Sequence, residues 1–275
     1  MNAITTQSLT LGYGEGSIIE ELDLNIPKGE VTVFIGSNGC GKSTLLRSLA
    51  RLLKPQSGSV VLDGNNISRM STKKVAQNLS ILPQSPVAPE GLTVSQLAKQ
   101  GRYPHQSWLQ QWSSADEEAV NKALEATRMV EFADRKVDDL SGGQRQRAWI
   151  AMNLAQDTDI MLLDEPTTYL DLAHQIDILD LLHELNVQEN RTIIMVLHDL
   201  NLACRYADHI VAIKDKKVYK QGSPDDIICP NLVHDVFGLR CQIACDPFCG
   251  TPMCIPFSKG RHMKPAEPEV SAVNA

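Results

Sequence analysis

The stretch that decides the fold reads Val31-Thr32-Val33-Phe34-Ile35-Gly36-Ser37-Asn38-Gly39-Cys40-Gly41-Lys42-Ser43-Thr44. Its first five residues are mostly apolar and predict a buried strand. The residues from Ser43 to Leu53 predict a helix, which Lys54-Pro55 ends. The segment between them matches the pattern G-x-x-x-x-G-K-[ST], and a preceding strand with a following helix is the context that this pattern needs. The sequence therefore predicts a phosphate-binding loop.

The chemistry of this loop points to a nucleotide. Glycines adopt positive φ and bring backbone N–H groups close to phosphate oxygens at a helix N-terminus. Lys42 adds a positive charge for the β- and γ-phosphates, and the Ser43 hydroxyl is a candidate ligand of Mg²⁺. The alternative is a glycine-rich turn with a chance Lys-Ser, which the flanking strand and helix make the weaker interpretation.

A second segment, Ile160-Met161-Leu162-Leu163-Asp164-Glu165, reads as a buried strand that ends in two carboxylates. Ligands of open α/β sheets bind at this end of the strands. One acid, Asp164, is a candidate ligand of Mg²⁺, and the next, Glu165, is a candidate for polarising an attacking water. Taken alone, Asp-Glu-Pro could merely end a strand; beside the phosphate loop a catalytic role is favoured.

A third segment, Leu140-Ser141-Gly142-Gly143-Gln144, lies between those two. Ser141 is a good N-cap for a helix from about Gly143 to Gln156, and two glycines leave the backbone N–H groups of that helix start uncovered. Such an end attracts an anion. If this chain's own loop already holds a nucleotide, the free helix end can serve the nucleotide of a second chain in a head-to-tail dimer. A plain helix start is the alternative.

The order of the elements predicts an α/β fold. β and α patterns alternate from Ser141 onward, which implies a largely parallel sheet covered by helices. Helical periodicity over 95–102 and 116–129 indicates a helical insertion. We predict one domain over 1–240 with this insertion at about 85–140, a cysteine-containing extension over 241–262, and a disordered tail over 263–275.

Bulk properties narrow the function. The 275 residues carry a formal net charge of −7, which gives no general attraction to nucleic acids. No apolar run approaches the roughly 20 residues needed to span a bilayer. The N-terminus lacks the charge and apolar core of a secretory signal. We expect a cytoplasmic protein with no nucleic-acid partner, held at a membrane only through another protein.

With these three segments in view, residues 3 to 240 resemble the ATPases of the ATP-binding-cassette (ABC) family. The resemblance implies a P-loop NTPase fold with a mostly parallel sheet, an N-terminal antiparallel β subdomain and an inserted helical subdomain. It implies ATP and Mg²⁺, the latter held by Ser43, Gln84 and Asp164. It also implies catalytic roles for Lys42, for Glu165 as the catalytic carboxylate and for His198 as a switch near the γ-phosphate.

The resemblance assigns nucleotide contacts beyond the loop. Tyr13 resembles the aromatic residue that stacks on adenine, and Gln84 the glutamine that touches Mg²⁺ or water and senses a transmembrane partner. Asp171 resembles the loop aspartate at the dimer seam. The signature residues that reach the γ-phosphate on the opposite cassette correspond to Ser141, Gly142, Gly143 and Gln144. By default, a tyrosine such as Tyr13 is more often a packing residue, and a histidine such as His198 caps or packs.

Local features resemble one branch, the ATPase subunits of ferric-siderophore importers, with haem and vitamin B12 importers as close relatives. These features are Gly101-Arg102-Tyr103-Pro104-His105, Arg145 to Trp149, Tyr169, and Asp246 to Pro252. The resemblance implies a second copy of the chain and a membrane permease as partners, indirectly a substrate-binding protein, and a place on the cytoplasmic face of the inner membrane.

Two other classes share part of this pattern. A P-loop kinase or GTPase would have the phosphate loop but no need for Leu140 to Gln144, and the guanine-specific Asn-Lys-x-Asp is absent from the sequence. A non-transport cassette acting as a binding or regulatory module often has two fused cassettes or a long coiled insertion, and neither occurs here.

Four of the seven cysteines, Cys241, Cys245, Cys249 and Cys254, lie close together near the end of the sequence. They lack the usual zinc and ferredoxin spacings. Reduced packing thiols are therefore favoured over a zinc or iron–sulfur site, which stays open as the alternative.

Overall fold

The computed structural model describes residues 1–107 and 112–258. Its centre is a six-stranded sheet in the order β10-β9-β3-β8-β7-β6, in which β9, β3, β8, β7 and β6 run parallel and β10 is antiparallel to β9. The strands, in chain order, are β3 (Val31–Ile35), β6 (Leu79–Leu82), β7 (Ile160–Leu163), β8 (Thr192–Val196), β9 (His209–Lys214) and β10 (Lys217–Gly222). The predicted, mostly parallel core is confirmed.

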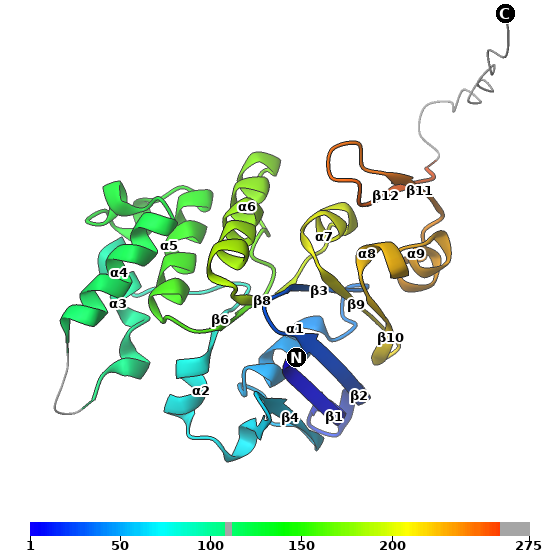
Figure 1. Cartoon of the computed structure of the whole chain (residues 1–275), viewed down its shortest axis with the longest axis horizontal. Coiled ribbons are helices and arrows are strands. Elements are labelled where there is room, and N and C mark those ends of the chain that lie inside the picture. The colour runs from blue at the N-terminus through cyan, green and yellow to red at the C-terminus, as the bar shows by residue number, and fades with distance from the viewer. Residues whose placement is uncertain (108–111, 259–275) are drawn as a thin grey trace, which may run out of the picture.

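A second, antiparallel sheet covers one face of the first. It has the order β2-β1-β4-β5, formed by β1 (Asn2–Tyr13), β2 (Gly16–Pro27), β4 (Ser57–Leu62) and β5 (Asn65–Asn66). Helix α1 (Lys42–Leu49) lies in this layer, and α2 (Thr72–Asn78) leads into β6 (Figure 1). The expected N-terminal antiparallel subdomain is thus present.

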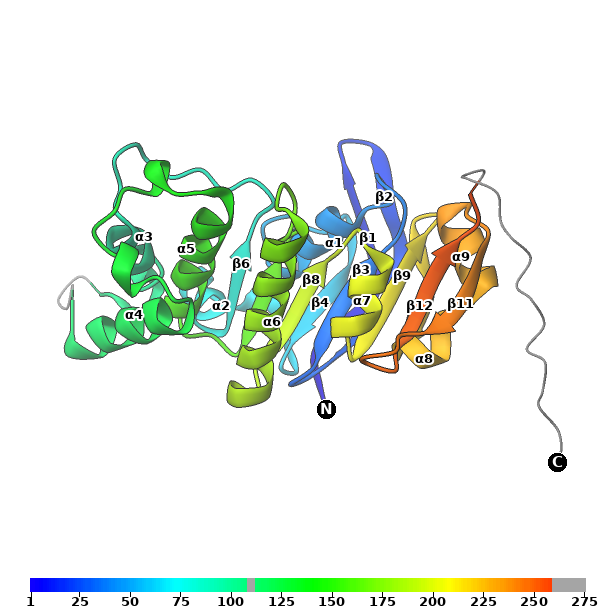
Figure 2. The ribbon, with the colours of Figure 1, turned by 90° about the horizontal axis from the view of Figure 1, so that it is seen from above.

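Helices cover the opposite face and extend beyond the sheet edge at β6. They are α3 (Val94–Gln100), α4 (Ser114–Ala126), α5 (Gly142–Ala155), α6 (Leu172–Glu189) and α7 (Leu200–Tyr206). Figure 2 shows α3, α4 and α5 gathered at one end of the molecule, with α6 and α7 across the sheet. This confirms the helical insertion and the helix predicted at 172–189.

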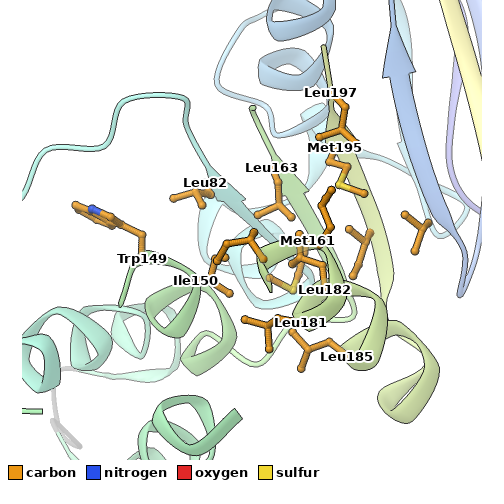
Figure 3. Close-up of a cluster of buried hydrophobic side chains, with 14 of the residues drawn as sticks. Leu82, Trp149, Ile150, Met161, Leu163, Leu181, Leu182, Leu185, Met195 and Leu197 are labelled. Atoms are coloured by element: carbon orange, nitrogen blue, oxygen red, sulfur yellow. The ribbon is translucent and has the colours of Figure 1, made fainter. Parts of the chain in front are cut away.

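Alternation along the central strands explains why the sheet is covered on both sides. In β7, Met161 and Leu163 belong to the core beneath the helices, whereas Ile160 and Leu162 belong to the core shared with the antiparallel sheet. Figure 3 shows Met161 and Leu163 close to Ile150 of α5 and Leu182 of α6. Because burial of one such side chain is worth about 1.5–3 kcal/mol, two apolar faces hold this sheet in place.

The last of the described elements lie outside the sheet layers. Short helices α8 (Pro224–Ile227) and α9 (Pro230–Phe237) precede a hairpin of β11 (Cys241–Cys245) and β12 (Pro252–Pro256), which packs against α7 and α9. The tail predicted over 263–275 lies outside the described residues, and the domain boundary near 240 stays a prediction. Among the described residues, none of the helices combines the length and apolar character that crossing a membrane requires.

The helix predicted from Ser43 to Leu53 is too long. It ends at Leu49, because Arg51 adopts a left-handed φ of 59° and the N–H groups of Leu52 and Leu53 both donate to the Arg47 carbonyl. The chain turns there rather than at Lys54-Pro55.

Candidate active site

Three parallel strands bring the predicted motifs to one edge of the sheet. β3 leads into the phosphate loop, β7 into Asp164-Glu165 and β8 into His198, so all three follow the carboxyl ends of neighbouring strands. They surround an open pocket of about 980 Å³ that is lined by loop residues 36–39 and 41–44 together with Gln84, Glu165, Thr168 and His198. We call the loop 36–44, Gln84, Asp164, Glu165 and His198 the nucleotide half of the site.

The phosphate loop is tightly shaped. Gly41, the N-cap of α1, has a φ of 104°, and a Cβ there would lie 2.9 Å from side-chain atoms of both Ile18 and Ile19. The Lys42 ammonium reaches back across the loop and donates to the carbonyls of Gly36 at 2.8 Å and Ser37 at 3.0 Å. The loop is thus closed around a buried lysine at a helix N-terminus, a position that favours a bound phosphate.

Ser43 and Asp164 meet behind the loop. The Ser43 hydroxyl donates to Asp164 Oδ1 at 2.8 Å, and Asp164 is buried. Burial raises the pKa of Asp164, the charge of Glu165 raises it further, and the bond from Ser43 opposes both. A hydroxyl and a carboxylate oxygen in contact form the hard-oxygen donor set that Mg²⁺ prefers, so these two residues fit the predicted ion. Gln84 lies on the pocket wall beside Glu165.

Glu165 is the most constrained residue of the site. Its φ of 54° is in the left-handed region that a non-glycine residue rarely occupies. Its Oε1 lies 2.6 Å from His198 Nε2, and its Oε2 accepts from Gln84 at 2.5 Å and Thr168 at 2.9 Å. Burial alone would raise the pKa of Glu165, but the hydrogen bonds from His198 and Thr168 outweigh it and the pKa is lowered. The carboxylate of Glu165 is therefore kept ionised, and its three hydrogen-bond partners fix its orientation at the pocket wall.

Ser141–Gln144 and Asp171 lie outside the described pocket, since none of these residues lines it. The Ser141 hydroxyl accepts from Gln144 N–H and the Gln144 side chain accepts from Ser141 N–H, a capping box at the start of α5. Asp171 caps α6. We call Ser141–Gln144 and Asp171 the signature half. Ser141, Gly142 and Asp171 are exposed, so this half presents itself to the outside of the chain.

Two predicted nucleotide contacts, Tyr13 and Cys40, do not line the described pocket. Tyr13 is about half exposed at the end of β1 and does not line the described pocket. Cys40 directs its sulfur toward the Lys42 ammonium, at 3.8 Å, rather than into the pocket.

Sequence reasoning missed several contributors. Thr168 lies three residues after Glu165 in a turn, and this spacing could have signalled its hydrogen bond. Ile18, Phe237 and Leu239 also line the pocket. They come from distant parts of the chain, and no sequence signal marks them.

The four terminal cysteines do not converge. Cys241 and Cys254 are buried between the hairpin and α9, whereas Cys245 and Cys249 are exposed. Burial raises the pKa of Cys254 to about 11. Across residues 1–107 and 112–258, no group of three or more His, Cys, Asp or Glu side chains is placed to hold a metal. The geometry thus favours packing thiols. The hairpin is held against α7 by an ion pair, in which Arg205 Nη2 lies 2.6 Å from Asp246 Oδ2.

Comparison with known proteins agrees with this architecture. Residues 19–168 match the family model described as "ABC transporter". The chain belongs to the ABC transporter family. As expected of an ABC ATPase, it carries the phosphate loop, the carboxylate pair and the signature segment in one chain, and the nucleotide it binds and hydrolyses is ATP.

Several relatives match almost the whole length of the chain. One is the "Probable siderophore transport system ATP-binding protein YusV" of Bacillus subtilis, with 68% identity over 95% of each chain. Another is the "Ferric enterobactin transport ATP-binding protein FepC" of Escherichia coli, with 52% identity over 92% of this chain and 93% of that protein.

A solved structure is also similar to this ABC ATPase. It is the dimeric, post-hydrolysis state of the ATP-binding cassette MJ0796 with ADP and phosphate, at a TM-score of 0.70 and 27% identity over 80% of this chain and 98% of that one.

Proposed function

We propose that this ABC ATPase is the ATP-hydrolysing subunit of an importer for a ferric siderophore. The observation that carries the hydrolytic role is the arrangement around Glu165, a carboxylate with a lowered pKa that is fixed by Gln84, Thr168 and His198 at the pocket edge. The siderophore assignment is supported by relatives whose names mention siderophore and ferric enterobactin transport.

The proposed reaction is in-line attack of water on the γ-phosphate of ATP, which breaks the bond to the oxygen bridging the β- and γ-phosphates and releases ADP and phosphate. Lys42 and the loop N–H groups bind the β- and γ-phosphates, and Glu165 orients the attacking water and accepts its proton. His198, 2.6 Å from Glu165, keeps that carboxylate in place at the γ-phosphate end of the pocket. Ser43 and Asp164, with Gln84 beside them, would hold Mg²⁺, which neutralises charge on the phosphates.

The site is proposed to be complete only between two copies. The signature half lies outside the pocket of its own chain, and its capped helix start would offer backbone donors to an anion. In a head-to-tail dimer, Ser141 to Gln144 of one copy would close on the nucleotide half of its partner. ATP binding would then draw the copies together and hydrolysis would release them.

The remaining partners are a membrane permease and, through it, a substrate-binding protein. We place the ATPase on the cytoplasmic face of the inner membrane, where the surface around Gln84 and the helices α3 to α5 would receive the permease. Cargo is bound by other subunits, so haem or vitamin B12 import is the alternative within this function. A regulatory, non-transport module is the alternative in another class.

Reconstitution tests the proposal. The ATPase, its co-purified permease and the binding protein in vesicles should take up radiolabelled iron as a ferric siderophore in an ATP-dependent way. Vesicles with Glu165→Gln protein are the matched control and should take up none. Uptake of haem or vitamin B12 but not of any siderophore in a panel would move the function to the alternative, and co-purification with ribosomes instead of a permease would refute transport.

A further inference from the structure

His174 stands between the two segments of the signature half. It lies in the first turn of α6, three residues after Asp171. Its ring Nδ1 lies 2.7 Å from Asp171 Oδ1, and its backbone N–H donates to the same oxygen at 2.9 Å. These bonds lower the pKa of Asp171, the backbone bond contributing most. The carboxylate therefore fixes the direction in which the ring points.

That direction leads to the second glycine of the signature. A Cβ built on Gly143 would lie only 2.2 Å from Cδ2 and 3.0 Å from Nε2 of His174. Real side chains do not approach so closely, so the ring rests directly on the Gly143 backbone and any larger residue at 143 would displace it. The neighbouring Leu170 side chain makes an ordinary van der Waals contact near Gly142, at 3.6 Å from a Cβ built there.

This contact joins two parts of the molecule. Gly143 lies in the first turn of α5, which belongs to the helical part, whereas His174 lies in the first turn of α6, which covers the central sheet (Figure 2). One turn further along both helices, Arg147 Nη2 lies 3.5 Å from Asp177 Oδ2. This ion pair is partly exposed and contributes little by itself. The imidazole ring, with Leu170 beside it, therefore packs between the start of α5 and Asp171.

We propose that His174 is a positioning residue of the signature half. It holds Ser141 to Gly143 and Asp171 in one fixed arrangement, so that both segments reach the nucleotide of the second copy together. The proposal rests on the two-copy site argued above and adds a residue that the motifs do not contain. His174 itself is placed against protein groups and need not touch ATP.

The test separates nucleotide binding within one copy from closure between copies. In a Glu165→Gln background, we would measure the affinity of the monomer for a fluorescent ATP analogue and the ATP-dependent monomer–dimer equilibrium by analytical ultracentrifugation. His174→Ala should leave the first unchanged and weaken dimer formation roughly tenfold or more, which corresponds to about 1.4 kcal/mol. A residue with only a general structural role would affect both.

Three further variants make the result decisive. His174→Asn keeps a donor for Asp171 but removes the ring from Gly143, so it should also weaken the dimer while leaving the helix cap intact. His183→Ala removes another histidine of α6, one that contacts Tyr206 instead, and should change neither measurement. Ser141→Arg should abolish dimer formation. Dimers as tight as the parent's with both His174 variants would overturn the proposal. Tight dimers with Ser141→Arg would instead overturn the two-copy site.

Discussion

The nucleotide half and the signature half both use polar side chains, but they differ in whether these side chains lie at a pocket of the same chain or on its exposed surface. In the nucleotide half, Lys42, Asp164 and Glu165 already have hydrogen-bond partners within the chain and line or back an open pocket. In the signature half, the side chains of Ser141 and Asp171 cap the helices α5 and α6, and both residues are exposed. The arrangement of the nucleotide half suits binding of a nucleotide within one chain, whereas that of the signature half suits contact with a nucleotide bound to a second copy.

This difference indicates that nucleotide binding depends on the nucleotide half, whereas closure of the dimer depends on the signature half. A group that is aimed and ionised before the ligand arrives loses little free energy on reorganisation when the reaction occurs. Glu165 is such a group. An exposed helix start contributes only when a phosphate reaches it, so its effect appears in dimer formation. Changes in one half should therefore be separable from changes in the other.

The largest effect should come from Glu165→Gln. The amide cannot accept the proton of the attacking water, so the hydrolysis rate should fall at least about 100-fold. ATP binding and ATP-dependent dimers should persist, because Gln keeps the shape of the side chain. Steady-state phosphate release and size-exclusion chromatography with ATP measure the two properties. Normal hydrolysis by this variant would remove Glu165 from its assigned role.

Ser141→Arg should prevent the signature half from closing on the nucleotide of a second copy. The long side chain blocks the exposed start of α5 and removes its cap, so we expect hydrolysis to fall roughly 100-fold from loss of closure. Equilibrium binding of a fluorescent ATP analogue to the monomer should stay at the level of the unmodified protein. Equal losses of monomer affinity and of hydrolysis would contradict the claim that the signature half acts only in closure of the dimer.

Lys42→Ala should show the reverse pattern. It removes a charge-assisted hydrogen bond to phosphate, so nucleotide affinity of the monomer should fall roughly ten- to a hundredfold. Isothermal titration with ATP checks this, with Lys54→Ala, a lysine beyond the end of α1, as the matched control. Unchanged affinity in the Lys42 variant would contradict the placement of the phosphates.

The smallest effect concerns pH. Thr168→Val removes one of the hydrogen bonds that lower the pKa of Glu165, so that pKa should rise and the acid limb of the hydrolysis rate should move to higher pH. The ionised Glu165 stabilises the fold above its unfolded pKa, and this contribution is lost as the pH falls through the lower native value. In the variant the loss should begin at higher pH. A shift toward lower pH, in rate profiles or thermal unfolding, would contradict the account.

Much of the nucleotide half could be predicted from the sequence. Parallel strands deliver their carboxyl ends to one edge, so short apolar runs that end in Gly36, Asp164 and His198 already place these residues together. The cap at Ser141 could be read for the same reason, since it depends on residues that are neighbours in the chain.

The rest depends on contacts that sequence spacing does not reveal. His174 sits three residues from Asp171 on a helix, but its packing on Gly143 arises only when α5 and α6 come together. Phe237 and Leu239 reach the pocket from the far end of the chain. The hairpin of β11 and β12 was not predicted as a unit, because its prolines and cysteines give no clear alternation.

The central claim is that each active site combines the nucleotide half of one copy with the signature half of another. Mixing Lys42→Ala protein with Ser141→Arg protein tests it most directly, because a mixed dimer has one site with both lesions and one with neither. Each variant alone should hydrolyse ATP slowly. The mixture should hydrolyse ATP several times faster than either variant alone, since every mixed dimer keeps one intact site. A mixture that hydrolyses no more ATP than the separate variants would contradict the claim.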